Sequence, residues 1–136
     1  MEVHLPKRCI VRRVENLAVR INPMNGREYN TFIAGGYRLV TGNHYAEGQL
    51  GVIIPAGAIV PDNILEEMWL KDKLSGAKRN KVKVKTMCGY ISEGIFYGRT
   101  WMDDQGVIRK SLLWKDTWLE GDDVTTQLGI TFGDNT

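Results

Sequence analysis

The sequence predicts an all-β fold with one or two short helices, arranged as a five-stranded Greek-key barrel. Runs of β-branched and aromatic residues recur between turn signals, which is typical of strands. One helical pattern, over residues 62–70, separates the third predicted strand group from the fourth, as expected for such a barrel. The length of 136 residues suits one domain. We therefore expect residues 1–136 to form a single barrel domain.

The predicted strands are separated by turn residues. Asn-Pro and Asn-Gly pairs make residues 22–28 a turn, while Gly35 and Gly36 suggest a bulge or a barrel corner. Residues 121–123 are expected to cap a second short helix that stops at Gly129. The expected strands are residues 9–21, which form one long or bent strand, and then 29–34, 37–40, 51–55, 81–87 and 94–98, followed by an apolar stretch at 107–119.

The helix expected over residues 62–70 has an apolar face. Its residues with i, i+3 and i+4 spacing are Ile64, Leu65, Met68 and Trp69. We expect this face to pack against the core. Large aromatic side chains mostly serve packing, so we expect core or interface anchors, rather than base-stacking platforms, at all four tryptophans: Trp69, Trp101, Trp114 and Trp118.

The composition is that of an ordinary globular chain, with 43% hydrophobic and 25% charged residues. No apolar run approaches the roughly 20 residues that span a bilayer, and residues 1–17 lack the apolar core of a signal peptide. We expect a cytoplasmic protein, or a virion protein if its origin is a phage, with no membrane partner. Cys9 and Cys88 fit this compartment as two reduced, buried thiols.

The net charge is only +2, but the charges are unevenly distributed. Such a chain can present one strongly positive face, and its opposed basic and acidic ends would suit head-to-tail contacts between copies. The N-terminal basic cluster is Lys7, Arg8, Arg12 and Arg13; the second is Lys71, Lys73, Lys78, Arg79, Lys81, Lys83 and Lys85, opposed only by Asp72; the acidic C-terminal residues are Asp116, Glu120, Asp122, Asp123 and Asp134.

The most informative functional feature is the alternating run at residues 81–87. Lysines are expected on one face of this strand, and Val82, Val84 and Thr86 on the other. Ammonium groups about 6.6 Å apart roughly match successive phosphates of an extended nucleic acid strand. The alternative is that this face is exposed to solvent and its lysines prevent the strand edge from pairing with another chain. The predicted nucleic-acid-binding residues are Lys78, Arg79, Lys81, Lys83, Lys85 and Tyr90, and the other aromatic residues considered for base stacking are Tyr29, Phe32, Tyr37, Tyr45, Phe96 and Tyr97.

The sequence has no recognisable catalytic motif. It contains neither a glycine-rich phosphate-binding loop nor the KxDG lysine of nucleotidyltransferases. His4 and His44 are isolated, and the adjacent carboxylates at residues 103–104 and 122–123 are expected to serve turns and helix caps. We therefore expect no catalytic centre, no cofactor and no metal site in this chain alone.

Three motifs occur in order between residues 47 and 131. They are EGQLGVIIPAGAIVPDNILEEMWL (47–70), KVKVKTMCGYISEGIF (81–96) and WLEGDDVTTQLGIT (118–131). The combination resembles the N-terminal oligonucleotide/oligosaccharide-binding (OB) domain of Deinococcus-type RNA ligases. More distantly, it resembles the tRNA-binding-type OB domain of the phenylalanyl-tRNA synthetase β chain. The resemblance implies an OB barrel that binds RNA or tRNA, without the catalytic half of the ligase.

One position departs from the family pattern. Cys88 stands where the family usually has arginine, so any guanidinium contact made there is lost. Gly89, Ser92 and Gly94 do match, and the two glycines would permit a tight backbone turn.

Two classes of function follow from these observations. The first is an RNA-binding or tRNA-binding OB module that has a ligase catalytic domain as its partner. The alternative is a structural or assembly protein, for example a phage or virion component, that uses the barrel for protein–protein contacts or forms a homo-oligomer. A third interpretation makes the chain a piece of a full ligase, in which the downstream coding sequence would contain a KxDG motif.

Overall fold

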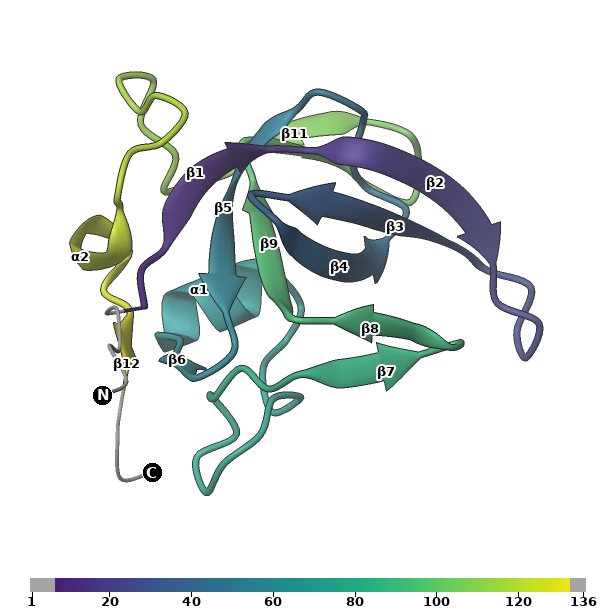
Figure 1. Ribbon diagram of the computed structural model, residues 1–136, viewed down its shortest axis with the longest axis horizontal. Helices are drawn as coiled ribbons and strands as arrows, with labels where there is room; N and C mark the ends of the chain where they lie inside the picture. Colours follow the sequence, from purple (N-terminus) through teal and green to yellow (C-terminus); the bar gives the residue numbers. More distant parts are fainter. Residues whose placement is uncertain (1–6, 133–136) are drawn as a thin grey trace, which may run out of the picture.

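The structure is a computed structural model that describes residues 7–132; His4 and Asp134, which entered the arguments above, lie outside this range. Over the described residues it is mostly β-strand with two short helices, so the all-β expectation is confirmed (Figure 1). The helices are α1 (Asp62–Glu67) and α2 (Thr125–Leu128). The strands are β1 (Ile10–Arg13), β2 (Glu15–Ile21), β3 (Glu28–Ala34), β4 (Tyr37–Gly42), β5 (Leu50–Pro55), β6 (Ala58–Ile59), β7 (Lys85–Met87), β8 (Tyr90–Ser92), β9 (Gly94–Gly98), β10 (Thr100–Met102), β11 (Ile108–Lys110) and β12 (Thr131–Phe132).

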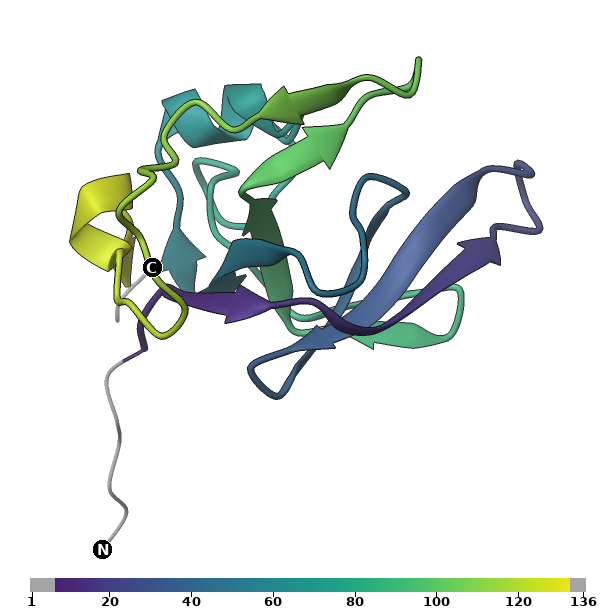
Figure 2. The same ribbon diagram turned by 90° about the horizontal axis from the view of Figure 1, so that it is seen from above.

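Two antiparallel sheets, with strand orders β1-β5-β9 and β2-β3-β4, form the body of the fold. β5 lies between β1 and β9, and it is buried from Gly51 to Pro55. Its central position explains the short uninterrupted apolar run that predicted this strand. The β2-β3-β4 sheet extends away from α2 in both views of the molecule (Figures 1 and 2).

β1 and β2 are the two halves of the bent strand expected over residues 9–21. Val14 separates them, and its N–H donates to the Gln49 carbonyl at 2.8 Å. β1 pairs with β5, whereas β2 pairs with β3 and has a register shift between Glu15 and Ala18. The bend therefore carries one segment from the first sheet into the second.

Gly35 and Gly36 form the two-residue turn of the β3–β4 hairpin, in which Ala34 pairs with Tyr37. Their φ angles are +56° and +85°, the left-handed geometry that a type I′ hairpin turn requires. The expected bulge or barrel corner is therefore wrong. The two strands turn back on each other at this glycine pair because only glycine adopts both positive φ angles without strain.

The strand expected over residues 81–87 is reduced to β7. Lys81 pairs with Ile59 and Ser75 through isolated bridges, and Val82 exchanges backbone hydrogen bonds with Gly57 and with Ala58 of β6. Val82 is buried, but Val84 is 52% exposed and Thr86 is exposed as well. The predicted shared apolar face is therefore wrong, because the first two residues bond to a different part of the chain than the β7–β8 hairpin does.

α1 is shorter than expected. It follows β5, the strand expected before it over residues 51–55, with the two-residue β6 between them. Ile64 and Leu65 are buried as predicted, but the helix ends at Glu67, and Trp69 beyond it is 76% exposed. α2 stops at Gly129 as predicted, with φ +70° at that glycine. Neither of these described helices is long and apolar enough to cross a membrane.

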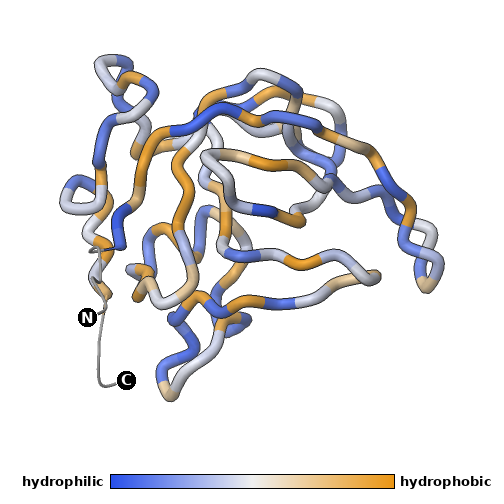
Figure 3. Tube along the Cα trace, viewed as in Figure 1, coloured by the Kyte–Doolittle hydropathy of each residue, from blue (hydrophilic) through white to orange (hydrophobic). Residues whose placement is uncertain are grey.

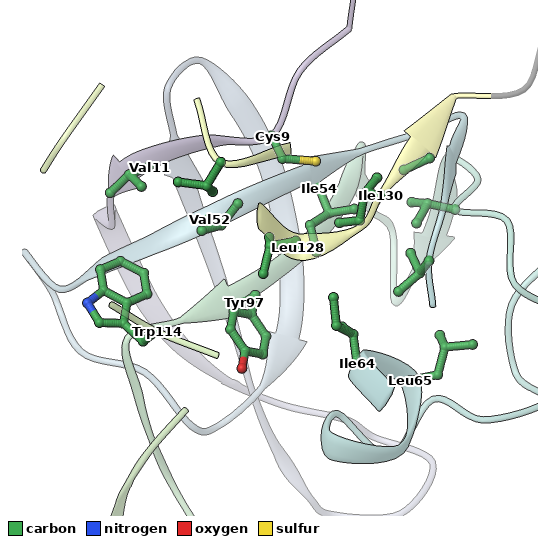
Figure 4. Packing of buried hydrophobic residues seen from close by; sticks show 14 of the residues in the cluster. Cys9, Val11, Val52, Ile54, Ile64, Leu65, Tyr97, Trp114, Leu128 and Ile130 are labelled. Carbon is green, nitrogen blue, oxygen red and sulfur yellow. The ribbon is translucent and has the colours of Figure 1, made fainter. Parts of the chain in front are cut away.

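Two groups of buried side chains form the core. The larger group includes Val52 and Ile54 of β5, Tyr97 of β9, and residues of both helices (Figure 4). The smaller group contains residues of both sheets, with the Phe32 and Phe96 rings edge to face at 5.0 Å. The hydrophobic stretches follow the strands, whereas the loop before β7 is mostly hydrophilic (Figure 3).

The described strand ladders do not close into a complete barrel. β4 nevertheless lies beside β8 and β9. The Glu93 N–H donates to the Arg38 carbonyl at 2.8 Å, and the Val40 N–H donates to the Ser92 hydroxyl at 3.1 Å. The two sheets therefore meet at this second edge through single hydrogen bonds instead of a regular ladder.

Candidate nucleic-acid interface

A cleft of about 980 Å³ is bounded by β4, β9, the end of α1 and the β10–β11 hairpin. Val40 and Ile95 contribute apolar surface to its lining. Trp69 and Lys73 line it just beyond α1, and Arg27 lines it from the turn between β2 and β3. The cleft thus combines an apolar surface with cations and an indole ring supplied by loops.

The four tryptophans lie in two kinds of environment. Trp114 and Trp118 are buried with ring centroids 5.1 Å apart, so the core expectation is confirmed for them. Trp69 is 76% exposed, so it is not a core residue. Trp101 is half-buried in the same cleft as Trp69, edge-on to His44 at 6.2 Å. Helical spacing misplaced Trp69 because the helix ends before it.

The basic loop, residues 71–85, carries most of the cations predicted to bind nucleic acid. Lys71 is paired with Asp62 at 3.0 Å, and Lys81 is half-buried. The remaining cations of this loop are exposed and form no ion pair with any carboxylate of residues 7–132; they are Lys73, Lys78, Arg79, Lys83 and Lys85. The loop therefore keeps a local excess of positive charge that a polyanion would neutralise.

The predicted phosphate-binding residues lie beside the cleft, not in it. Within the basic loop, Lys73 is the residue that lines the cleft. The Lys85 ammonium lies 3.4 Å from the Lys73 carbonyl, so the start of β7 is next to the cleft rim. Sequence reasoning missed Lys73 and Arg27 as cleft residues because neither belongs to the alternating pattern. Only the tertiary structure brings them to the same cleft.

Tyr90 lies on β8 against Arg20 of β2. The Arg20 guanidinium carbon is 4.1 Å from the centre of the Tyr90 ring, and Arg20 Nε donates to the Thr31 hydroxyl at 2.8 Å. The ring is 37% exposed. One face of Tyr90 thus already has a cation–π partner, which leaves only part of the ring open to a base.

Most other aromatic candidates are not available for stacking. The buried ones are Tyr29, Phe32, Phe96 and Tyr97, and the half-buried ones are Tyr37 and Tyr45. The Tyr45 hydroxyl donates to the Phe96 carbonyl at 3.0 Å, and burial raises the pKa of Tyr45 to about 12. The Tyr97 hydroxyl donates to Glu67 at 2.5 Å. The prediction that these buried rings stack on bases is therefore wrong, because a base needs an open ring face.

Two cations of the N-terminal basic cluster are paired with the acidic C-terminal segment. Arg8 binds Asp123 at 2.7 Å, and Arg13 binds Glu120 at 3.3 Å. The Thr125 hydroxyl lowers the pKa of Asp123, and Arg8 lowers it further. The opposed charges expected to support head-to-tail contacts are therefore neutralised within the chain at these residues.

The two cysteines differ in exposure. Both are free thiols, and Cys9 is buried, which raises its pKa to about 12. Cys88 is exposed in the β7–β8 turn, so the expectation of two buried thiols is wrong for it. Cys88 and Gly89 have φ angles of +52° and +84°, which gives Gly89 the tight-turn role that was expected.

Ser92 and Gly94, which match the family pattern, also have structural roles. The Ser92 hydroxyl donates to the Gly94 carbonyl at 3.0 Å and accepts from the backbone of β4. A Cβ atom at Gly94 would lie 2.5 Å from the Ile54 carbonyl oxygen. A side chain at this position would therefore push β9 away from β5.

Asp103 and Asp122 serve turns, as predicted, but the cap expected from residues 121–123 is wrong, because the N-cap residue of α2 is Val124 and it forms no side-chain cap hydrogen bond. Asp103 accepts hydrogen bonds from the Gln105 and Val107 backbones, both at 2.9 Å, in the β10–β11 turn. The Leu119 N–H donates to Asp122 at 2.8 Å, and Asp123 accepts from the Thr125 backbone at 3.0 Å at the start of α2. Within residues 7–132, no three His, Cys, Asp or Glu side chains are grouped closely enough to hold a metal ion.

Comparison with known proteins finds solved structures that share this fold. Neither a family model nor a curated protein matches this chain. Among solved structures, Naegleria gruberi RNA ligase with PPi superimposes with a TM-score of 0.69 at 16% identity, over 97% of this chain and 36% of the ligase chain. Part of an RNA ligase shares this fold.

Two variants of the same ligase give a similar result. One, solved with ATP and Mn, superimposes with a TM-score of 0.65 at 21% identity, over 93% of this chain and 35% of the ligase chain. Another, also with ATP and Mn, has a TM-score of 0.67 at 19% identity, over 95% of this chain and 36% of the ligase chain. The chain thus spans about a third of the length of these ligases, and the likeness establishes the fold.

Proposed function

We propose that this chain is an RNA-binding OB module that works with a nucleotidyltransferase domain located elsewhere, in a longer chain or in a partner. The observation that carries the proposal is the likeness to Naegleria RNA ligase, which extends over 97% of this chain but only 36% of that one. A module without the rest of the ligase would contribute binding rather than catalysis. Contact with tRNA, which the sequence resemblance implied, is a narrower form of the same proposal.

The strand neighbours support an OB-type barrel. β1 with β2 forms a first ribbon, which is followed by β3 and β4 as the second and third, β5 as the fourth and β9 as the fifth. Ladders connect the first ribbon to the second and the fourth, the second to the third, and the fourth to the fifth. Hydrogen bonds between Arg38 of the third ribbon and Glu93, just before the fifth, link these two ribbons without a ladder. A partly open Greek-key barrel is the OB architecture.

The position of the cleft supports the proposal, because OB domains bind oligonucleotides at one face of the barrel. That face consists of the second and third strands, with the loop between strands one and two and the loop between strands four and five. In this chain Tyr29 and Thr41 come from β3 and β4, and Arg27 comes from the first of those loops. Lys73 belongs to the second, which includes the basic loop. All four line the cleft.

We assign phosphate contacts to the exposed cations of the basic loop, which are Lys73, Lys78, Arg79, Lys83 and Lys85. Phosphate contacts dominate affinity for nucleic acid and do not depend on base sequence. Contacts by Lys81 and Tyr90 stay predictions, because Lys81 is half-buried and Tyr90 already faces Arg20.

Fluorescence anisotropy with labelled oligonucleotides tests this function. We expect the full chain to bind an unstructured RNA of about 12 nucleotides at about 50 mM salt, with affinity that falls steeply as salt is added. Single-stranded DNA of the same sequence and a tRNA, measured in parallel, determine which nucleic acid it prefers. Absence of binding to all three at low salt would contradict the proposed function.

One observation favours an assembly role as a second candidate. β2 pairs with one described strand only and exposes Val19 and Ile21, and Met24 in the adjacent turn is 90% exposed. Apolar side chains on a sheet edge promote pairing between copies. Light scattering over a wide concentration range tests this candidate: a stable oligomer supports it, and a monomer at every concentration contradicts it.

A further inference from the structure

We infer that Trp69 is a stacking platform on which the chain holds a base of single-stranded RNA at the mouth of the cleft. This inference rests on the proposed function and adds a site to it. The basic loop would hold the phosphates, while Trp69 would contact a base directly. The sequence pattern gave no indication of this site, because it predicted that Trp69 packs in the core.

The backbone around Trp69 has a form normally built with glycine. After α1, the Trp69 N–H donates to the Glu66 carbonyl at 3.3 Å, and the Leu70 N–H donates to the Leu65 carbonyl at 2.8 Å. This pair of bonds is a Schellman motif, in which the residue corresponding to Trp69 is left-handed and usually glycine. Trp69 has φ +60°.

The other helix end of the molecule makes the contrast clear. α2 also ends on a left-handed residue, and there the sequence has Gly129 with φ +70°. Glycine adopts this conformation without the steric penalty that every other residue has. A bulky residue in such a conformation is a reason to look for a functional role, and at Trp69 the local backbone alone does not require an indole.

Packing does not explain the indole either. Trp69 is 76% exposed, whereas Trp114 and Trp118 are 6% and 8% exposed. Its neighbour Leu70 is half-buried against the core, so the Schellman turn directs Leu70 inward and leaves Trp69 in solvent. An exposed ring of this size offers an open face for a partner.

The surroundings of Trp69 fit a base better than a phosphate. Within the cleft, Asp103 pairs with Arg109 at 2.7 Å, and Glu67 accepts from the Tyr97 hydroxyl and the Leu112 backbone. With Glu28 and Asp104, the carboxylates of the cleft lining outnumber its cations, which are Arg27, Lys73 and Arg109, and this disfavours a phosphate deep in the cleft. Lys73 lines the same cleft and continues into the basic loop. A strand that runs along this loop can therefore keep its phosphates on the lysines and point a base at Trp69.

Intrinsic fluorescence tests the contact directly. Trp69 is the most exposed of the four tryptophans, so a stacked base should quench mainly its emission. We expect an oligouridylate of about 12 nucleotides to quench the wild-type chain and to have little effect on Trp69→Phe. An abasic oligonucleotide with the same number of phosphates should bind through the lysines without this quenching.

Affinity measurements give a second readout. We expect Trp69→Ala to weaken binding of the oligouridylate by about 5- to 150-fold, the range for loss of one base–aromatic stack. Trp69→Phe should retain part of the affinity, because it keeps an aromatic ring. Leu119→Ala is the matched control, since Leu119 is 67% exposed outside the cleft and should leave affinity unchanged.

A glycine variant separates binding from stability. Trp69→Gly removes the left-handed penalty together with the ring, so it should melt about 3–5 °C higher than Trp69→Ala yet bind RNA as weakly. If Trp69 only stabilised the fold, affinity would follow stability, and the more stable Trp69→Gly would bind RNA more tightly than Trp69→Ala.

The outcomes distinguish this inference from the proposed function. If the wild-type chain binds no nucleic acid, the proposed function fails and the inference fails with it. If the wild type binds RNA but Trp69→Ala binds equally tightly, and the abasic strand binds as well as the oligouridylate, only the assignment of Trp69 is overturned. Quenching that survives in Trp69→Phe would overturn it too.

Discussion

The two basic regions of this chain are both rich in Lys and Arg but have different partners in the fold. In the N-terminal cluster, Arg8 and Arg13 form ion pairs with Asp123 and Glu120. In the basic loop, five exposed cations form no ion pair with any described carboxylate. The comparison teaches that a cluster of positive residues indicates a ligand only where the fold supplies no carboxylates of its own.

The backbone explains why Arg8 and Arg13 of the first region are paired. The Val11 N–H donates to the Asp122 carbonyl at 2.9 Å, and the Val124 N–H donates to the Cys9 carbonyl at 2.9 Å. These bonds hold the acidic segment alongside β1, within reach of the arginines. The basic loop instead connects α1 to β7 and has only Asp72 within its own sequence.

The largest expected difference between the two regions is in RNA affinity. Replacing Lys78, Arg79, Lys83 and Lys85 together by Gln should weaken RNA binding by roughly 10- to 100-fold at low salt, because four phosphate contacts are lost. Anisotropy titrations measure this effect. The matched control, Arg8→Gln with Arg13→Gln, should bind like the wild type. Equal losses of RNA affinity in the two variants would contradict the proposed difference between the regions.

The salt dependence of binding sharpens the same comparison. The slope of log K against log salt should become shallower by about 0.7 for each phosphate contact that the loop variant loses on a single strand. The N-terminal variant should keep the wild-type slope. An unchanged slope in the loop variant would mean that its cations do not contact phosphate.

Asp123, which pairs with Arg8 of the N-terminal cluster, should contribute to the pH dependence of stability. Because the folded state lowers the pKa of Asp123, the stabilisation is present above the unfolded pKa of about 3.9 and is lost as pH falls through the folded value. Asp123→Asn should therefore melt lower than the wild type at pH 7, by an amount that shrinks toward pH 3. Parallel melting curves of the two proteins across this range would contradict the prediction.

The smallest expected effect is the loss of one surface ion pair. Arg13→Ala should lower the free energy of unfolding by about 0.2–1 kcal/mol, since both Arg13 and Glu120 are partly exposed. Urea denaturation of Arg13→Ala, Glu120→Ala and the double variant isolates the pair energy. Additive effects of the two single changes would show that the pair contributes nothing.

Local sequence signals predicted the elements better than their connections. The buried strand at β5, the bent strand at β1 and β2, and the end of α2 at Gly129 were all predicted, because each depends on residues next to one another. The alternating strand before β7 was wrong because tertiary contacts at Val82 interrupt it. Trp69 was misplaced because its helix ends one turn early.

The sequence by itself determined that this chain is mostly β-strand, where its turns fall, and how many cations it carries. Only the tertiary structure decided which cations are neutralised and which aromatic ring is exposed. The physical reason is that charge pairing and burial depend on what lies opposite a residue in space. Asp123 reaches Arg8 across 115 positions of the chain, and no local pattern records such a contact.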